Sequence, residues 1–539
     1  SRSPEEVMSV RNGIALLLAL STLTFLVACG SSSPTAVAPP TGGFSNSNLK
    51  GTYVISILGS DVNNSADTES FFAIVGTINA DGNGNITGGT VDINDPDIGG
   101  VFPAQTLTAS TYKLGADGRG TGSLVTPEGT FGLDFVLTSN GHGLITRFDS
   151  AGSGSGTLDL QNSTSQSSLT SLTFSLTGTD ATSEFLLGSA GGFTLDSSGN
   201  ITPGTGIQDF NEGGSSAGLS DLALGGSLVL TSGTSGTAVL ATSSIFGSLS
   251  FDVWVIDSTH LKLIETDAVA VLAGDAFTQQ TSFTAGQLVF TLSGSDSTGA
   301  ALVAGGFVTT DVNGNLTAGI EDFNDAGTTI STVPSFTGTC TSFVAGRCLL
   351  ALTGFSNGSS QSFVFAAYPS SGGIQLLEVD SLGQLQGTAY NQSATSFAAS
   401  EGYGLNLSGT NGNEVDDIAQ FNAASATSSP NMTGILDEND LGAPASPVSL
   451  SGTYTPDSTP DGRGGISVPN IKTLNGLLTL QYYVIDGSTM LFIEGDSGQV
   501  AAGTFAVQSA SSSPGSAQPV VSMFRPLVRP HTAMKKKQK

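Results

Sequence analysis

Residues 172–180, Leu-Thr-Phe-Ser-Leu-Thr-Gly-Thr-Asp, decide the fold of this 539-residue chain. Large apolar side chains at Leu172, Phe174 and Leu176 alternate with small polar ones. A period of two residues is typical of an antiparallel β-strand that buries one face and leaves the other in contact with water. The segment ends on a glycine followed by Thr and Asp. The same alternation ends on equivalent triplets elsewhere in the chain, at Gly59-Ser60-Asp61, Gly294-Ser295-Asp296 and Gly409-Thr410-Asn411.

A second motif follows each of these segments. It has the form G-T/D-x-x-x-Q and occurs at 156–161, 274–279, 387–392 and 503–508. Each motif recurs after 113–119 residues, and further markers lie between the two in constant order. Two independent markers with nearly the same period indicate four tandem units.

Each unit is predicted to be all-β, because turns rich in Gly, Asn and Asp separate short alternating segments. About eight strands joined by local hairpins form a meander, and an eight-stranded meander can close into a small barrel. An immunoglobulin-like sandwich of similar size is the alternative. The expected organisation is a signal peptide (1–29), a tether (30–47), four β units (48–161, 168–280, 284–392 and 397–508) and a basic tail (509–539).

The N-terminal region predicts where in the cell the protein is located. Leu26-Val27-Ala28-Cys29-Gly30 ends an apolar run of about 14 residues, which is shorter than the roughly 20 that a transmembrane helix needs. The run is typical of a signal peptide that begins at Met8, and its end resembles a bacterial lipobox. We therefore expect cleavage before Cys29, a lipid on its thiol, and attachment to a membrane. By resemblance to lipoproteins of two-membrane bacteria, Gly30 favours the outer membrane or cell surface.

Charge excludes one class of partner. Residues 51–508 contain seven Lys and Arg against 42 Asp and Glu, a formal balance of −35. Nucleic-acid binding needs clustered basic residues, so it is not expected for this region. The tail carries Arg525, Arg529 and the run 535–539, which favours attraction to envelope polymers or to the acidic units.

The chain has three cysteines. With Cys29 taken by the lipid, Cys340 and Cys348 remain, and an oxidising compartment permits a disulfide between them. Their spacing suits two facing strands of one hairpin. The alternative is a pair of free buried thiols.

Acidic residues recur in each unit. Asp81 and Asn83, and the D-x-N element of Asp92 and Asn94, are typical either of an oxygen-rich calcium site or of turns capped by Asp and Asn side chains. D-x-N elements follow at Asp209, Asp322 and Asp437.

The few arginines suggest ion pairs within each unit. We expect Arg119 to pair with Asp149, Arg347 with Glu378 or Asp380, and Arg463 with Glu494 or Asp496.

The sequence contains few candidate catalytic residues. The three histidines have no counterpart in other units, and no nucleophile or metal motif occurs. Carboxylate pairs such as Glu265 and Asp267 could serve a carbohydrate-active enzyme, but their recurrence favours a structural element. No cofactor is expected, with calcium as the one candidate.

The order of these motifs after Cys29 resembles repeat-containing lipoproteins of soil bacteria such as acidobacteria. The resemblance agrees with a lipid anchor at Cys29. That family has no known activity, so the resemblance implies no biochemical mechanism for this chain. We expect a lipid-anchored envelope protein that acts as a binding or structural module, with glycans or envelope polymers as partners. The alternatives are a lipocalin-like carrier of a small apolar ligand and an enzyme.

Overall fold

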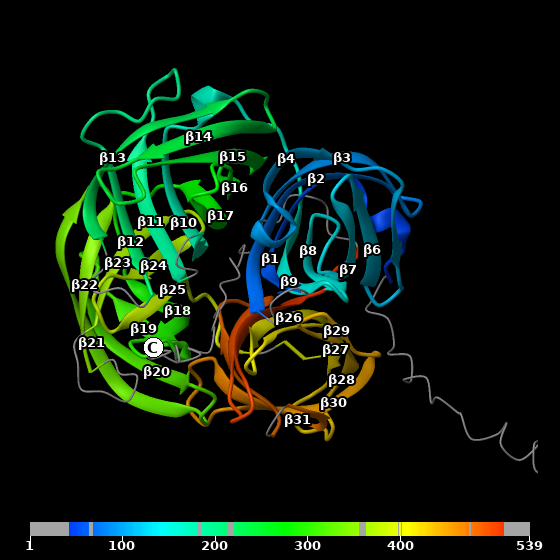
Figure 1. Cartoon of the computed structure of the whole chain (residues 1–539). Helices are drawn as coiled ribbons and strands as arrows, with labels where there is room; N and C mark the ends of the chain where they lie inside the picture. The colour runs from blue at the N-terminus through cyan, green and yellow to red at the C-terminus, as the bar shows by residue number, and fades with distance from the viewer. Residues whose placement is uncertain are drawn as a thin grey trace, which may run out of the picture. The chain divides into compact units, whose positions relative to one another are not determined.

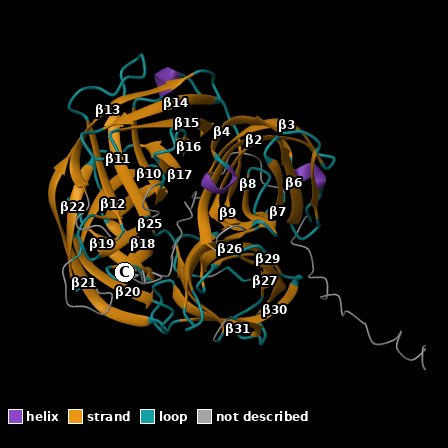
Figure 2. Cartoon of the chain, viewed as in Figure 1, coloured by secondary structure: helices purple, strands orange, loops and turns teal. Residues whose placement is uncertain are grey.

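The structure is a computed structural model, and it describes residues 43–63, 68–181, 185–213, 219–354, 363–396, 398–399, 401–473 and 476–510. Their regular secondary structure consists of strands, apart from three single 3₁₀ turns, η1 (Asn46–Asn48), η2 (Pro96–Ile98) and η3 (Gln166–Ser168) (Figure 2). The strands form four closed antiparallel barrels in chain order (Figure 1). The predicted all-β fold of four eight-stranded meander barrels is therefore confirmed, and the sandwich alternative is wrong.

Barrels 1 and 4 share one variation. Their fourth position holds two successive segments, both paired with the third strand. The strands of barrel 1 are β1 (Lys50–Asn63), β2 (Thr68–Asp81), β3 (Asn85–Asp95), β4 (Gly100–Thr106), β5 (Ser110–Leu114), β6 (Arg119–Thr126), β7 (Gly129–Leu137), β8 (His142–Asp149) and β9 (Gly152–Leu160). Those of barrel 4 are β26 (Gly402–Thr410), β27 (Glu414–Ala423), β28 (Met432–Asp440), β29 (Ala443–Pro444), β30 (Val448–Pro456), β31 (Arg463–Lys472), β32 (Leu477–Val484), β33 (Thr489–Glu494) and β34 (Val500–Val507).

Barrels 2 and 3 have eight strands each. Barrel 2 consists of β10 (Ser171–Asp180), β11 (Leu186–Thr194), β12 (Gly206–Glu212), β13 (Leu219–Leu230), β14 (Ser235–Ala241), β15 (Ser248–Asp257), β16 (His260–Glu265) and β17 (Ala270–Thr278). Barrel 3 consists of β18 (Gly286–Asp296), β19 (Ala301–Thr310), β20 (Leu316–Asp325), β21 (Ser331–Val344), β22 (Arg347–Thr353), β23 (Val364–Ser370), β24 (Gly373–Glu378) and β25 (Gly383–Asn391).

The two repeated motifs close each barrel, because the last strand pairs with the first. In barrel 1, Gly156 of the closing motif lies opposite Ile57, and in barrel 4 Gly503 lies opposite Leu407. A Cβ atom at Gly156 would lie 1.6 Å from the carbonyl oxygen of Ser56, and one at Gly503 would lie 2.2 Å from that of Asn406. Glycine is therefore required here, because the two backbones approach too closely for any side chain.

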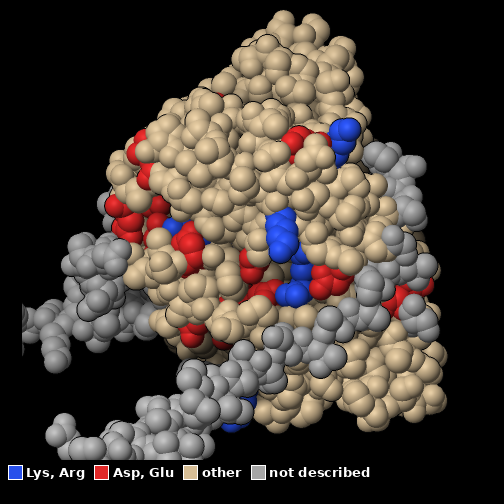
Figure 3. Space-filling model, turned by 90° about the vertical axis from the view of Figure 1, so that its right-hand side faces the viewer, with Lys and Arg blue, Asp and Glu red and all other residues tan. Residues whose placement is uncertain are grey.

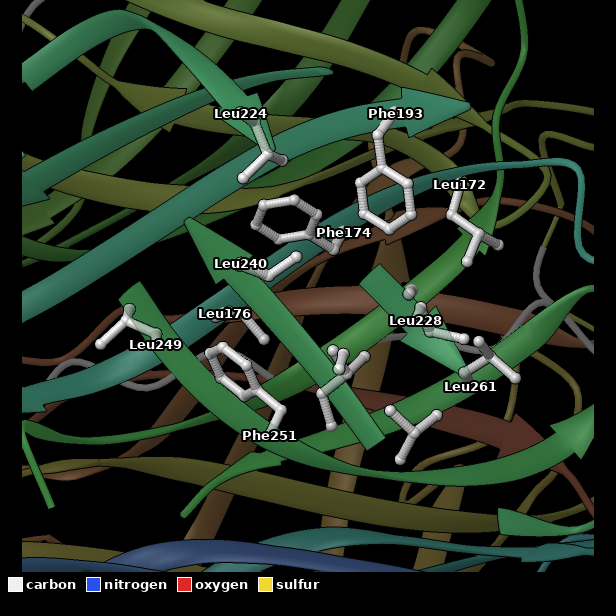
Figure 4. Close-up of a cluster of buried hydrophobic side chains, with 14 of the residues drawn as sticks. Leu172, Phe174, Leu176, Phe193, Leu224, Leu228, Leu240, Leu249, Phe251 and Leu261 are labelled. Atoms are coloured by element: carbon white, nitrogen blue, oxygen red, sulfur yellow. The ribbon is translucent and has the colours of Figure 1, made fainter. Parts of the chain in front are cut away.

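The alternating apolar residues fill the barrel interiors. In barrel 2, Leu172, Phe174 and Leu176 point inward and pack against residues of the other strands (Figure 4). These three side chains are at most 1% exposed. Closure removes unpaired strand edges, and the filled interior supplies each barrel with its own hydrophobic core.

Candidate functional site

The D-x-N elements lie on the third strand of each barrel and face the next barrel. In barrels 1 to 3 the middle residue, which is Ile93, Phe210 or Phe323, belongs to the barrel's own core, whereas barrel 4 has the half-buried Glu438 at this position. Because side chains alternate along a strand, the flanking Asp and Asn point outward. Asp92, Asp209, Asp322 and Asp437 are each at most 5% exposed. A buried carboxylate needs a partner, and each of these four finds its partner in the neighbouring barrel.

The contact between barrels 2 and 3 uses a buried arginine. The guanidinium of Arg347 donates two hydrogen bonds of 2.6 Å to the two carboxylate oxygens of Asp209. The hydroxyl of Tyr368 also donates to Asp209. Burial lowers the pKa of Arg347, but the hydrogen bonds and charge of Asp209 outweigh this effect and raise the pKa overall. The guanidinium of Arg347 thus keeps its charge within the interface.

Barrels 3 and 4 repeat this arrangement. Arg463 donates to the two oxygens of Asp322 at 2.7 and 2.6 Å, and the hydroxyl of Tyr483 donates to Asp322 at 2.8 Å. The side chain of Arg463 is 19% exposed, compared with 3% for Arg347. Solvent therefore screens this pair more than the pair between barrels 2 and 3.

The same contact joins barrel 4 back to barrel 1. Arg119 donates to Asp437 at 2.7 Å and to Asp117 of its own turn at 3.1 Å. Contacts therefore run from barrel 1 to 2, 2 to 3, 3 to 4 and 4 to 1, so that the series closes on itself.

Barrels 1 and 2 satisfy the carboxylate without a cation. Ser235 occupies the arginine position of barrel 2, and its strand partner is Trp254. The indole Nε1 of Trp254 donates to Asp92 at 2.7 Å, and the backbone N–H of Ala104 donates to the other oxygen at 2.7 Å. Burial nevertheless raises the pKa of Asp92 to about 6. The only tryptophan in the chain thus takes the place of the missing arginine.

Near the end of each of barrels 2 to 4 lies an E-x-D element, at Glu265, Glu378 or Glu494, and barrel 1 has Arg147 in place of the glutamate. The asparagine of each D-x-N element donates to backbone carbonyl oxygens at this turn of the next barrel. Asn324 donates to the carbonyl oxygens of Glu494, Asp496 and Gln499 at 3.0–3.2 Å. Asn439 makes the same contacts with barrel 1, to Arg147, Asp149 and Gly152. The other two asparagines do likewise, Asn94 with Glu265 and Ala270, and Asn211 with Glu378 and Gly383.

The glutamine that ends each closing motif supplies a third contact. Its side-chain amide donates to a backbone carbonyl at the turn that precedes the arginine position of the next barrel. Gln392 donates to Asp461, and Gln508 donates to Asp117, both at 2.9 Å. Gln161 and Gln279 make the corresponding contacts with Thr234 and Ala345. Three repeated side chains therefore form one interface four times.

These contacts correct the predicted ion pairs. The sequence assigned Arg119 to Asp149, Arg347 to Glu378 or Asp380, and Arg463 to Glu494 or Asp496. The structure instead gives each arginine the D-x-N aspartate of the preceding barrel. The reason is geometric, since the arginines reach across to the preceding barrel, whereas Glu378 and Glu494 are fully buried. Asp149 pairs with Arg147 instead, at 3.2 Å.

Each E-x-D element joins a fully buried glutamate to an aspartate that is half-buried in barrels 2 and 3 (Asp267 and Asp380) and buried in barrel 4 (Asp496). Glu265, Glu378 and Glu494 are 0% exposed, and the same position in barrel 1 holds Arg147. Burial, followed by the neighbouring aspartate, raises the pKa of Glu265 to about 9 and that of Glu378 well above its usual range. These glutamates therefore carry a proton near neutral pH. They lie too deep in the fold to act on a polymeric substrate.

The residues considered for calcium are engaged in other contacts. Asp81 accepts hydrogen bonds from the backbone N–H groups of Asn83 and Asn85 and from the Asn85 side chain, which is the turn chemistry that the sequence left as the alternative. Asp92 and Asn94 lie in the interface with barrel 2. Within the part of the chain that the structure describes, no group of three or more His, Cys, Asp or Glu is arranged to hold a metal ion.

Two histidines also contact buried carboxylates. Nδ1 of His142 lies 2.6 Å from Asp159, and Nε2 of His260 lies 2.6 Å from Asp275, which also pairs with Lys262 at 2.6 Å. Burial by itself would raise the pKa of Asp159, but the charge and hydrogen bond of His142 lower it overall, with a smaller contribution from Lys262 across the contact between barrels 1 and 2. No role was predicted for these residues from the sequence.

The disulfide between Cys340 and Cys348 is confirmed, with Cα atoms 5.7 Å apart on β21 and β22. Cys29, Met8, the tether up to residue 42 and the tail from 511 lie outside the described residues, so those predictions remain predictions. No helix among the described residues is long and apolar enough to cross a membrane. Figure 3 shows one face on which charged side chains occupy only small areas among uncharged residues.

Comparisons with known proteins add no family. No protein-family model matches the chain, and no curated protein matches it. Among solved structures, the chain is similar to one described as "Crystal structure of CghA". The two sequences are 9% identical, the TM-score is 0.14, and the match covers 89% of this chain and 95% of the other. A TM-score of this size supports no argument about function.

Proposed function

We propose that this protein is a lipid-anchored component of the bacterial cell envelope whose four barrels act together as a non-catalytic binding or structural module. The observation that carries the proposal is the use of the repeated polar residues. The Asp, Asn, Arg and Gln side chains that recur from unit to unit make the contacts between barrels. A repeated residue set that builds interfaces supports a scaffold rather than an active site.

The anchor rests on the sequence alone. The apolar run before Cys29 is too short to span a bilayer, and its last residues resemble a lipobox. A lipid on Cys29, followed by a proline-containing tether, would hold the barrels at a membrane surface while leaving their faces accessible.

The surface suits neutral, polar partners. Many acidic side chains are buried at interfaces or barrel ends, so the chain's strong negative charge is not all displayed to solvent. Ser, Thr and Gly remain abundant outside. Such a surface can bind envelope polymers or glycans through hydrogen bonds, without opposite charge.

The interior of barrel 3 gives less support to a carrier of small apolar ligands. Its apolar cavity, lined by Phe283, Phe290 and Phe365 among others, has a volume of about 40 Å³. Ligand pockets for small molecules typically measure about 300–1,000 Å³. We therefore retain the scaffold as the proposed function.

Anchoring is tested by expressing the full chain and a Cys29→Ser variant in a bacterium that processes lipoproteins. We expect the native chain to incorporate an alkyne-tagged fatty acid and to fractionate with membranes, and the variant to lose both properties. Cys340→Ser is the matched control, because it removes a cysteine away from the lipobox. Equal labelling and equal membrane retention of Cys29→Ser would rule out the anchor.

Binding is tested with the full chain against immobilised neutral and acidic polysaccharides. The proposal expects retention on at least one neutral polymer, weakly dependent on salt because few charges take part. Retention only on acidic polymers, abolished by salt, would point to the basic tail instead of the barrels.

A further inference from the structure

The turn before the interface arginine is organised by an aspartate in two of the barrels. In barrel 1, the backbone N–H of Arg119 donates to the carboxylate of Asp117 at 3.1 Å. In barrel 4, the backbone N–H of Arg463 donates to that of Asp461 at 3.0 Å. The carbonyl oxygens of these two aspartates also accept the glutamine of the preceding barrel. One residue thus shapes the turn and presents an acceptor to the neighbouring barrel.

In barrel 2 the hydroxyl of Ser232 orders the corresponding turn. Ser235 stands at the arginine position, and its backbone N–H donates to the hydroxyl of Ser232 at 3.0 Å. Thr234, in the same turn, presents its carbonyl oxygen to Gln161 at 3.1 Å. A side-chain oxygen therefore holds this turn in barrels 1, 2 and 4.

Barrel 3 is the exception. Ala345 occupies the aspartate position, and it has no side-chain oxygen to accept the N–H of Arg347. Its φ is +53° and that of Gly346 is +78°, so both residues of this tight turn are in the left-handed region. An alanine is disfavoured there. The turn nevertheless presents the carbonyl oxygen of Ala345 to Gln279 at 3.1 Å.

The disulfide encloses this turn. Cys348 directly follows Arg347 and is 0% exposed, and Cys340 lies on the opposite strand beyond a β-bulge. The covalent link therefore limits the motion of both strands that lead into the turn. The segment it encloses holds the two groups that reach barrel 2, which are the Arg347 guanidinium and the Ala345 carbonyl.

We propose that the Cys340–Cys348 disulfide replaces the missing turn aspartate and positions Arg347 for Asp209, so that the contact between barrels 2 and 3 responds to thiol–disulfide exchange. The reductant is a dithiol. Its two thiols become one disulfide, the Cys340–Cys348 bond breaks, and two protons and two electrons pass to the cysteine sulfurs. The contacts of barrel 4 with barrels 3 and 1 contain no cysteine and do not respond.

The test is amide hydrogen exchange of the full chain, compared with a Cys340→Ala/Cys348→Ala variant. We expect exchange to accelerate at least tenfold in residues 341–349 and, across the interface, in the part of β12 that bears Asp209. The turns at Asp117 and Asp461 serve as internal controls and should not change. Native protein reduced by dithiothreitol gives the same comparison if the variant does not fold.

A rescue variant separates this role from general stabilisation. Ala345→Asp, added to the Cys340→Ala/Cys348→Ala variant, restores the D-G-R sequence of barrels 1 and 4. We expect it to recover most of the lost protection at β12. Acceleration confined to residues 341–349, with β12 unchanged, would overturn the proposal, as would an Ala345→Asp variant that leaves β12 exchange as fast as before.

Discussion

Replacing Arg347 by methionine tests the interface chemistry most severely. Methionine keeps much of the apolar volume but removes the guanidinium that donates both 2.6 Å hydrogen bonds to Asp209. Asp209 is 0% exposed, so its carboxylate would stay buried with only the Tyr368 hydroxyl and the backbone N–H of Asp221 as donors. Breaking a buried pair by removing one partner costs about 3–5 kcal/mol.

We expect a loss of about 3 kcal/mol in the free energy of unfolding, at the lower end of this range because two donors remain. Arg119→Met should cost less, about 1–2 kcal/mol, since Arg119 is 21% exposed and solvent screens its charge. Lys472→Met, which changes an exposed cation on β31, is the control and should alter stability by less than about 0.5 kcal/mol.

The assay is urea denaturation of the full chain in a double-mutant cycle with Asp209→Asn. Removing the charge with its partner should recover about 2 kcal/mol relative to the sum of the single changes. The same cycle with Asp380→Asn should give no coupling. Strong coupling to Asp380, or a loss below about 1 kcal/mol for Arg347→Met, would refute the reasoning.

Three further predictions concern other parts of the structure. The fluorescence emission of Trp254 should titrate with a midpoint near pH 6, because its indole donates to Asp92, whose pKa is raised to about 6. Since this pKa is raised on folding, the contribution of Asp92 to stability is fully present below its unfolded pKa and is lost as the pH rises through its folded pKa. Emission that stays flat between pH 4.5 and 8 would contradict this. Asn324→Ala should lower the free energy of unfolding by about 2 kcal/mol in urea because three carbonyl oxygens lose their donor, whereas the exposed Asn313→Ala should have little effect. Gly503→Val should cost about 3 kcal/mol or prevent folding, because its Cβ would lie 2.2 Å from the Asn406 carbonyl oxygen; a native circular dichroism spectrum and an unchanged melting temperature would show that barrel closure tolerates a side chain.

The sequence predicts the barrels well because their signal is local. Alternation at Leu172, Phe174 and Leu176 sets the inward face, and the repeated closing glycines mark the last strand. Together they specify eight strands per unit without any knowledge of the partner barrel.

The interfaces escaped prediction for a reason that applies to any tandem repeat. When units are alike, an aspartate such as Asp322 has an equivalent arginine in its own unit, Arg347, and another one repeat later, Arg463. Sequence spacing alone cannot separate these two partners. The outward direction of Asp and Asn beside an inward Phe323 was available as a signal, and it would have favoured a partner outside the barrel.

Trp254 illustrates a second limit. The second unit lacks the arginine, and nothing in its local pattern identifies an indole as the replacement. The assignment depends on the register that sets Trp254 opposite Ser235, which is a property of the folded barrel.

We infer that the four repeated interfaces unite the barrels into one cooperative body. Differential scanning calorimetry of the full chain tests it most directly, through the ratio of the calorimetric to the van't Hoff enthalpy. We predict a single transition with a ratio close to one, because no barrel can unfold without breaking two interfaces. A ratio near four, or separate transitions that each account for one barrel, would contradict the claim.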